Sequence, residues 1–183
     1  PVFPAPEHQY AVDPLSLQWA QTGLGNDWAY FGVYPNPNTG LTPGQAQAQY
    51  FNLANAAAPT AGAQARVTGF GSVVAPIPPT WNYVQKTGAG PYTALNGNAI
   101  WYAMDTTGGN SGSPVILESS GLAFGVHTAG GCNASGGANG GTAIQTPKLQ
   151  TALAMPKGVC ATGASGVPSG PMYAIGDAAN NLG

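Results

Sequence analysis

The sequence predicts an all-β protein, and three observations point to that class. Short apolar runs alternate with clusters of Gly, Pro and Asn, which is the pattern of strands joined by turns. Helix signals are scarce, although 183 residues are enough for one ordinary domain or two small barrels. The strands are expected at short spacing, with turns between them, and this favours a barrel or a sandwich.

Each predicted element rests on a local signal. A helix is expected over residues 146–155, because Thr146 precedes Pro147 and apolar residues follow at helical spacing. Residues 42–54 begin with the same Thr-Pro signal and form either a helix or a long surface loop. The tail 161–183 is expected to be loop as far as the stretch Met-Tyr-Ala-Ile. Apolar runs bounded by turn residues predict strands at 28–34, 64–70, 82–87, 100–104, 113–117, 123–128 and 141–144.

The composition is unusually poor in charge. Charged residues make up 5% of the chain, against roughly 25% in a typical soluble protein, while hydrophobic residues make up 43%. Four Lys and Arg residues and a net charge of −2 argue against nucleic acid and acidic membrane surfaces as partners. We find no run of 18 apolar residues and no signal peptide. We expect a secreted protein, and the opening Pro-Val-Phe-Pro-Ala-Pro reads like the middle of a longer chain.

The stretch DTTGGNSGSPVI at 105–116 has the pattern of a nucleophilic serine in a glycine-rich loop. A hydroxyl is a poor nucleophile at its ordinary pKa, so it needs a base to take its proton and donors to stabilise the oxyanion that forms. Glycine lets backbone N–H groups converge on one point. The candidate nucleophile is therefore Ser111, and the candidate oxyanion donors are the N–H groups of Gly109 and Ser111. A glycine-rich turn between strands is the alternative that this string alone leaves open.

The wider context resembles the chymotrypsin-fold serine proteases, and among them the V8-like glutamyl endopeptidases. The ten residues TTGGNSGSPV at 106–115 are similar to the nucleophile loop of that family. VTGFG at 67–71 is similar to the strand that opens the second barrel, and FGVHTAGG at 124–131 to the strand that lines the specificity pocket. The likeness covers about half the chain, from Arg66 to Leu153. It implies a secreted serine endopeptidase.

The fold implied by this resemblance is a double β-barrel with a short C-terminal helix. The C-terminal barrel would be complete in this chain and the N-terminal barrel only partial. Residues 1–60 would then supply part of the N-terminal barrel and the inter-barrel connection. Residues 61–160 would form the C-terminal barrel with the nucleophile loop and the helix, and residues 161–183 a C-terminal tail.

The resemblance also implies catalytic partners for Ser111. Asp27, in an Asp-Trp-Ala stretch at the start of a predicted strand, matches the orienting aspartate of the family. The general base should be a histidine that precedes Asp27, but His8 stands only 19 residues before it and follows no strand pattern. We therefore expect the base to lie outside these residues, on a second polypeptide from the same precursor that docks on strands 28–34 and 64–70. A non-catalytic binding module of protease fold is the competing interpretation.

Substrate binding is implied at Thr106, His127, Thr128 and Gly130 by the same resemblance. Thr106 and His127 would donate hydrogen bonds to the carboxylate of a Glu or Asp side chain before the cleaved bond. Two positions depart from the family. HTAGG stands in place of the family's His-Trp-Gly-Gly, and Asn110 occupies the place where many animal relatives carry an Asp. In those relatives this Asp pairs with the N-terminus that zymogen cleavage frees, so activation here would not use that ion pair.

The cysteines and the ionisable residues carry two further expectations. Cys132 and Cys160 either form a disulfide or remain thiols, and the extracellular character of the composition favours the disulfide. The carboxylates, histidines and cysteines show no metal-ligand spacing. We therefore expect no metal and no cofactor, and protein or peptide substrates as partners.

Overall fold

A computed structural model describes residues 4–54 and 59–162, and these form two compact units. The larger unit consists of Trp19–Ala29 and Phe51–Ala154. The described part of the smaller unit consists of residues 4–18, 30–50 and 155–162. None of the described helices is long and apolar enough to cross a membrane.

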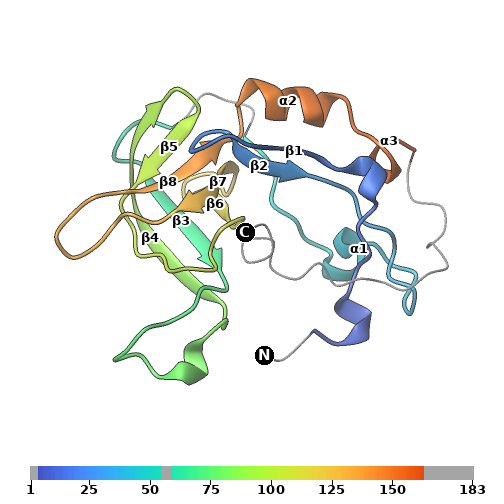
Figure 1. Ribbon diagram of the computed structural model, residues 1–183, viewed down its shortest axis with the longest axis horizontal. Coiled ribbons are helices and arrows are strands. Elements are labelled where there is room, and N and C mark those ends of the chain that lie inside the picture. The colour runs from blue at the N-terminus through green and yellow to red at the C-terminus, as the bar shows by residue number, and fades with distance from the viewer. Residues whose placement is uncertain (1–3, 55–58, 163–183) are drawn as a thin grey trace. The chain divides into compact units, whose positions relative to one another are not determined.

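The larger unit is built on a closed antiparallel barrel of six strands, in the order β3-β4-β5-β8-β7-β6 (Figure 1). The strands are β3 Gln64–Gly69, β4 Lys86–Asn96, β5 Ala99–Tyr102, β6 Pro114–Leu117, β7 Ala123–Ala129 and β8 Asn139–Ala143. Closure leaves no strand edge of the barrel unpaired, which protects it from pairing with other chains. The predicted all-β class and the complete C-terminal barrel are confirmed.

The barrel closes around an apolar core. Alternate residues of β3, beginning with Ala65 and Val67, point inward, as the two-residue period of a strand requires. The rings of Tyr92 and Phe124 meet edge to face at 5.6 Å between centroids. The other core residues are Ile100, Tyr102, Met104, Val115 and Ala143. Tyr102 before the nucleophile loop, Met104 near its start and Val115 after it are thus fixed in this core.

The strands β1 Gln18–Gln21 and β2 Asp27–Tyr30 form a separate two-stranded sheet. No third strand pairs with them among the described residues. That this short sheet belongs to an N-terminal barrel stays a prediction. The second polypeptide expected on strands 28–34 and 64–70 stays a prediction, but it cannot pair with strand 64–70 as an added strand, because β3 already pairs with β4 on one edge and with β6 on the other.

The smaller unit holds short helices and loops. It contains 3-10 helices at Pro6–His8 and Pro14–Ser16, with the α-helices α1 Pro43–Gln47 and α3 Val159–Thr162. Its buried polar side chains are Asp13, Ser16 and Asn36. The Asp13 carboxylate accepts the N–H of Val159 at 2.8 Å and that of Leu15 at 3.0 Å, so it ties α3 to the second 3-10 helix.

Several element boundaries differ from the sequence prediction. The C-terminal helix of the barrel is confirmed as α2 Pro147–Ala154. In the stretch 42–54 only α1 is helical, with Thr42 as a capping box, and it ends where Ala48 takes a left-handed conformation. The strand expected at 82–87 begins instead at Lys86 and continues to Asn96, after a third 3-10 helix at Pro79–Trp81. Strand β1 and helix α3 were not predicted. The tail 163–183 lies outside the described residues.

Candidate active site

The nucleophile loop connects β5 to β6 and carries Ser111 at its exposed tip. Two backbone hydrogen bonds fasten the end of this loop to β7: Gly112 N–H to the His127 carbonyl and His127 N–H to the Ser113 carbonyl, both at 2.9 Å. The Ser111 hydroxyl donates to the carbonyl of Thr128 over 3.4 Å, which is a long and weak bond. The Ser111 hydroxyl can therefore exchange this bond for one to a stronger acceptor.

The two candidate oxyanion donors are unpaired. Neither the Gly109 N–H nor the Ser111 N–H has an acceptor in the described part of the chain, and both residues are exposed. Gly109 has a φ of +92°, a backbone conformation that strains any residue with a Cβ. The loop therefore leaves both N–H groups without an acceptor in the described chain, as the oxyanion-site hypothesis requires.

Asn110 is the buried anchor of this loop. Its Nδ2 donates to the carbonyl of Thr107 at 3.1 Å, and only 6% of the residue is exposed. The amide lies so close to Gly69 and Gly71 that a Cβ on either glycine would collide with it. Asn110 thus packs the loop against the turn that follows β3 by close contact with Gly69 and Gly71, while its hydrogen bonds stay within the loop.

Asp27, the candidate orienting carboxylate, is the first residue of β2 and is half-buried. Its backbone is fixed to the barrel by Thr142 of β8. The Thr142 hydroxyl donates to the Asp27 carbonyl at 2.8 Å and accepts the Asp27 N–H at 3.1 Å. The structure gives the Asp27 carboxylate no hydrogen bond to Ser111.

His127 lies on β7 with 2% of its surface exposed, inside the barrel wall. Its Nδ1 meets the hydroxyl of Tyr102 at 2.5 Å, and the same hydroxyl is 3.3 Å from the Gly140 carbonyl. Burial lowers the pKa of the His127 imidazole and raises that of the Tyr102 phenol. Both groups are therefore neutral at pH 7. The Nδ1 atom of His127 is thus already occupied by Tyr102.

His8 ends the 3-10 helix Pro6–His8 of the smaller unit and is exposed. Its imidazole makes no hydrogen bond within the described residues. Since His127 is held by Tyr102, neither histidine of the chain is hydrogen-bonded to Ser111 in this structure.

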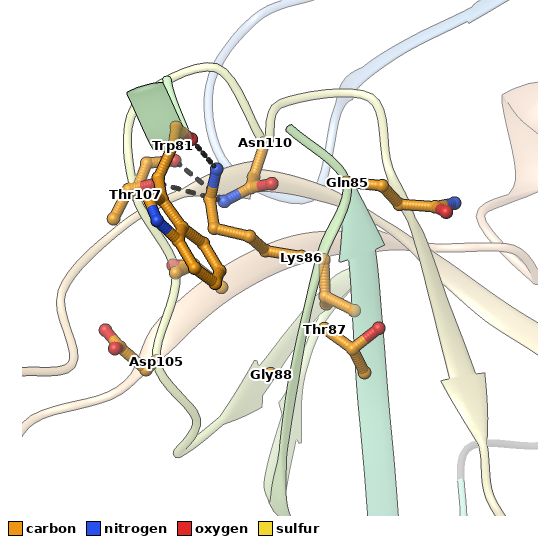
Figure 2. Close-up of a pocket in the computed structure, with 10 residues that line it drawn as sticks. Trp81, Gln85, Lys86, Thr87, Gly88, Asp105, Thr107 and Asn110 are labelled. Atoms are coloured by element: carbon orange, nitrogen blue, oxygen red, sulfur yellow. Dashed lines mark hydrogen bonds between the residues drawn. The ribbon is translucent and has the colours of Figure 1, made fainter. Parts of the chain in front are cut away.

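The remaining specificity candidates are distributed over two places. Thr128 donates its hydroxyl to the Gly140 carbonyl at 3.4 Å, and Gly130 follows on the exposed end of the same segment. The Thr106 hydroxyl is buried and has no hydrogen-bond partner among the described residues. Thr106 lines a cavity of about 420 Å³ together with Asp105, Trp81 and other residues, but His127 does not line it (Figure 2). Thr106 and His127 are thus not joined by a hydrogen bond.

The predicted disulfide is not formed in this structure. Cys132 and Cys160 are both free, half-buried thiols. Each has contacts within its own unit: the Cys132 N–H donates to Asn139 at 3.0 Å, and the Cys160 sulfur lies against Gly32. Within the described residues, no three His, Cys, Asp or Glu side chains are placed to hold a metal ion.

Sequence reasoning missed three residues that shape the site. Tyr102 fixes the imidazole of His127, Ser72 binds the nucleophile loop, and Lys86 binds the turn that carries Ser72. Tyr102 looked like an ordinary apolar strand residue, and no local pattern marks a serine or a lysine whose partners are backbone carbonyls of another segment. Their roles arise only from tertiary contacts.

No protein-family model and no curated protein sequence matches the chain. Solved structures do match its fold. A Glu endopeptidase in complex with MPD is 20% identical over 76% of this chain and 62% of that one, with a TM-score of 0.56. A thermostable serine protease from an extremophilic microorganism is 16% identical over 79% of this chain and 68% of that one, with a TM-score of 0.58.

An inactivated protease paralogue of the scabies mite is also similar. It is 14% identical over 79% of this chain and 66% of that one, with a TM-score of 0.53. The matched part of this chain thus spans only 62% to 68% of the length of these three structures. At such identities the likeness concerns the fold, and the set includes both proteases and a protein described as inactivated.

Proposed function

From the chymotrypsin-like fold that the chain shares with serine proteases, we propose that it is the nucleophile-bearing part of a secreted serine endopeptidase. The observation that carries this proposal is the nucleophile loop. Ser111 presents an exposed hydroxyl next to two unpaired backbone N–H groups, those of Gly109 and Ser111. A binding module has no chemical need for an exposed hydroxyl beside an open oxyanion site.

The proposed reaction is acyl transfer through Ser111. A general base removes the hydroxyl proton while Oγ attacks the peptide carbonyl carbon, and the carbonyl oxygen becomes an oxyanion bound by the Gly109 and Ser111 N–H groups. The base then delivers the proton to the leaving amine as the C–N bond breaks. Water, activated by the same base, hydrolyses the acyl-enzyme and returns the proton to Ser111. Asp27 would orient the base and stabilise its charged form.

The general base of this proposal is a histidine outside the 183 residues, on a second polypeptide of the same precursor. His127 is unsuited to the role because its Nδ1 is held by Tyr102 inside the barrel wall. The β1–β2 sheet supports the proposal, since two strands alone are marginally stable and no further strand pairs with them in the described chain. Trp19 of β1 is 62% exposed, which offers an apolar surface to added strands.

We propose a preference for Glu, or Asp, before the cleaved bond. The shorter contact of the Tyr102 hydroxyl is to His127, so we assign its proton to the bond with Nδ1. The imidazole proton then resides on Nε2, which becomes a donor toward a substrate carboxylate. The candidate second donor is the buried Thr106 hydroxyl, which has no partner among the described residues but lines a cavity that His127 does not line. The Asp105 carboxylate beside Thr106 is the feature that opposes this preference, because it would repel an acidic side chain.

The competing function is a pseudoprotease that binds its target without cleaving it. Its support is that no histidine is hydrogen-bonded to Ser111 in this structure and that the similar folds include an inactivated paralogue. The two functions differ in what the native preparation contains and in whether Ser111 reacts.

The experiment that separates them uses protein purified from its native source. We expect an intact-mass measurement to find a second polypeptide of several kilodaltons, and a fluorophosphonate probe to label Ser111. Ser111→Ala should lower turnover at least about a thousandfold and leave the residual rate that oxyanion binding provides. An unlabelled Ser111 in a native preparation would assign the pseudoprotease function instead.

The proposed specificity is tested by digestion of a peptide library with the same preparation. We expect Glu to dominate the position before the cleaved bond, and His127→Asn to reduce that preference. Cleavage mainly after Lys or Arg would overturn the proposal and would point to the Asp105 cavity as the site of the substrate side chain.

A further inference from the structure

Lys86 makes an unusual set of contacts behind the nucleophile loop. It is the first residue of β4 and lies opposite Gly69 in the β3–β4 ladder. Its Nζ donates to the backbone carbonyls of Gly71 at 2.6 Å, Trp81 at 2.8 Å and Val84 at 2.9 Å. An ammonium group has three protons, so all of them are used.

Among residues 4–54 and 59–162, no carboxylate pairs with this ammonium group. The one ion pair recorded in the described chain joins Arg66 to Glu118. Figure 2 shows the Lys86 ammonium at the Trp81 carbonyl and the Asp105 carboxylate well apart from it. A cation held only by carbonyl dipoles ties their backbone segments together, and charge-assisted hydrogen bonds of this kind are stronger than neutral ones. Lys86 therefore clamps the turn at Gly71 to the segment 81–84.

The clamped turn holds one peptide unit of the nucleophile loop. Ser72, next to Gly71, donates both its N–H, at 2.7 Å, and its hydroxyl, at 3.0 Å, to the carbonyl of Gly108. That carbonyl belongs to the same planar peptide unit as the N–H of Gly109. In a trans peptide the C=O and N–H bonds point in opposite directions. Fixing the Gly108 carbonyl toward Ser72 therefore fixes the Gly109 N–H away from the turn.

We propose that Lys86 is a positioning residue, which acts through Gly71 and Ser72 to hold the Gly109 N–H in its oxyanion-binding orientation. The inference rests on the proposed peptidase function, and it explains why the Gly109 N–H keeps its orientation. Gly108 and Gly109 have no side chains that could fix this peptide unit, so its orientation depends on the two bonds from Ser72. Without the three Lys86 bonds, only the Tyr83 N–H to the Gly71 carbonyl, at 3.2 Å, and the Val73 N–H to Asn82 Oδ1, at 2.7 Å, still join the turn to segment 81–84 in the described chain. The turn is then held less firmly, and the Gly109 donor loses its fixed orientation.

The test compares Lys86→Met with Lys148→Met in the native preparation. Methionine keeps most of the lysine stem and removes the three donors, whereas Lys148 lies exposed on α2 and provides the same charge change. We expect Lys86→Met to lower kcat about 10- to 100-fold with KM within about threefold, because one oxyanion donor is worth about 100- to 1000-fold. Lys148→Met should keep the wild-type kcat. Equal kcat values for the two variants would overturn the proposal.

A second measurement, of backbone amide signals by NMR, tests the role of Lys86 without relying on catalytic activity. In the ¹⁵N-labelled chain, we expect the amide signals of Gly109 and Ser72 to move or broaden in Lys86→Met and to stay in place in Lys148→Met. Ser72→Ala removes only the hydroxyl bond to Gly108, so it should move the Gly109 signal without disturbing the Lys86 clamp. This variant replaces Lys86→Met in the test if Lys86→Met does not fold. Unreactive wild-type protein would refute the peptidase function, whereas unmoved Gly109 signals in Lys86→Met and Ser72→Ala would refute the role of Lys86.

Discussion

The barrel and the smaller unit are stabilised by different kinds of contact. Ile100 and Phe124, at the centre of the barrel, are 0% and 2% exposed and belong to one continuous apolar cluster. The smaller unit buries Asp13, Ser16 and Asn36 instead, and each of them is hydrogen-bonded. Apolar contacts tolerate small displacements, while a buried polar group loses most of its stabilisation when one partner is missing.

The proposed catalytic residues lie on the barrel unit, which is the one of the two units with a continuous apolar core. The nucleophile loop begins after Tyr102 and ends before Val115, and both of these residues are core residues of the barrel. Asp27 is fastened to the barrel through Thr142. A site that must hold donors within fractions of an ångström benefits from such a rigid support. The smaller unit carries none of the candidate catalytic residues.

The largest effect is expected from a cavity in the barrel core. Ile100→Ala removes three buried carbons next to Gly125 and should lower the free energy of unfolding by about 3–4 kcal/mol. Urea unfolding monitored by near-ultraviolet circular dichroism measures the loss. The matched control is Leu95→Ala on β4, where the side chain is 43% exposed and the loss should stay below about 1 kcal/mol. Equal losses in the two variants would contradict the assignment of the core.

The next effect concerns the smaller unit and its buried amide. Asn36 donates to the carbonyls of Pro6 and Gln9, both at 2.7 Å, and accepts the N–H of Asn38 at 2.8 Å. Asn36→Ala leaves these groups without partners and should destabilise this unit by about 2 kcal/mol. Hydrogen exchange should accelerate in peptides from residues 30–50 and stay unchanged in the barrel strands. Asn38→Ala, at an exposed side chain, should change neither, and faster exchange in the barrel would show that the two units unfold together.

The contrast between the units also explains what the sequence could predict. The alternation of apolar residues in β3 and the apolar run that begins at Ala123 in β7 predict buried strands directly. The Thr-Pro pair at its start predicts the helix α2. β1 was missed because Gln18–Gln21 has only one large apolar residue, Trp19, and that side chain is exposed. The structure of the smaller unit depends on contacts of Asp13 and Asn36 with residues far away in the sequence. Such contacts leave no periodic pattern in the sequence.

The candidate site shows the same division. The glycine-rich string predicted a loop at this place, because glycine conformations are a local property. The convergence of its N–H groups on an oxyanion stays a prediction. The bond from Tyr102 to His127 joins β5 to β7, and the bond from Ser72 to Gly108 joins two loops 36 residues apart. Contacts of this kind are set by barrel closure, which a single sequence does not encode in any short stretch. Asp27 was predicted by resemblance, and its catalytic role stays a prediction.

A smaller effect, within the barrel, should follow the titration of His127. Burial holds its pKa in the folded state below the ordinary value of 6.5. Below pH 6.5 the unfolded chain binds a proton that the folded chain does not, so stability is complete above this pH and declines as the pH falls toward the folded-state pKa. Urea midpoints measured from pH 8 to pH 5 should decline, and His127→Asn should remove most of the decline. The control is His8→Gln, because His8 is exposed; a decline that persists in His127→Asn would assign it to another group.

The smallest effect is expected in the smaller unit at acid pH, where Asp13 titrates. The N–H of Val159, and then that of Leu15, hold the pKa of the Asp13 carboxyl below its ordinary value of 3.8, and desolvation opposes them only in part. Since the folded-state pKa is the lower one, the stabilisation is complete well above pH 3.8 and is lost as the pH falls through the folded-state pKa. Asp13→Asn should weaken the contact of α3 at pH 7 and remove the acid-dependent part of its loss. Acid unfolding of residues 155–162, followed by pulsed proteolysis between pH 5 and pH 2, measures this in comparison with Glu7→Gln, an exposed carboxyl of the same unit. If Asp13→Asn unfolds with the acid profile of the wild type, Asp13 does not hold α3, and the buried polar groups that organise this unit would be Ser16 and Asn36.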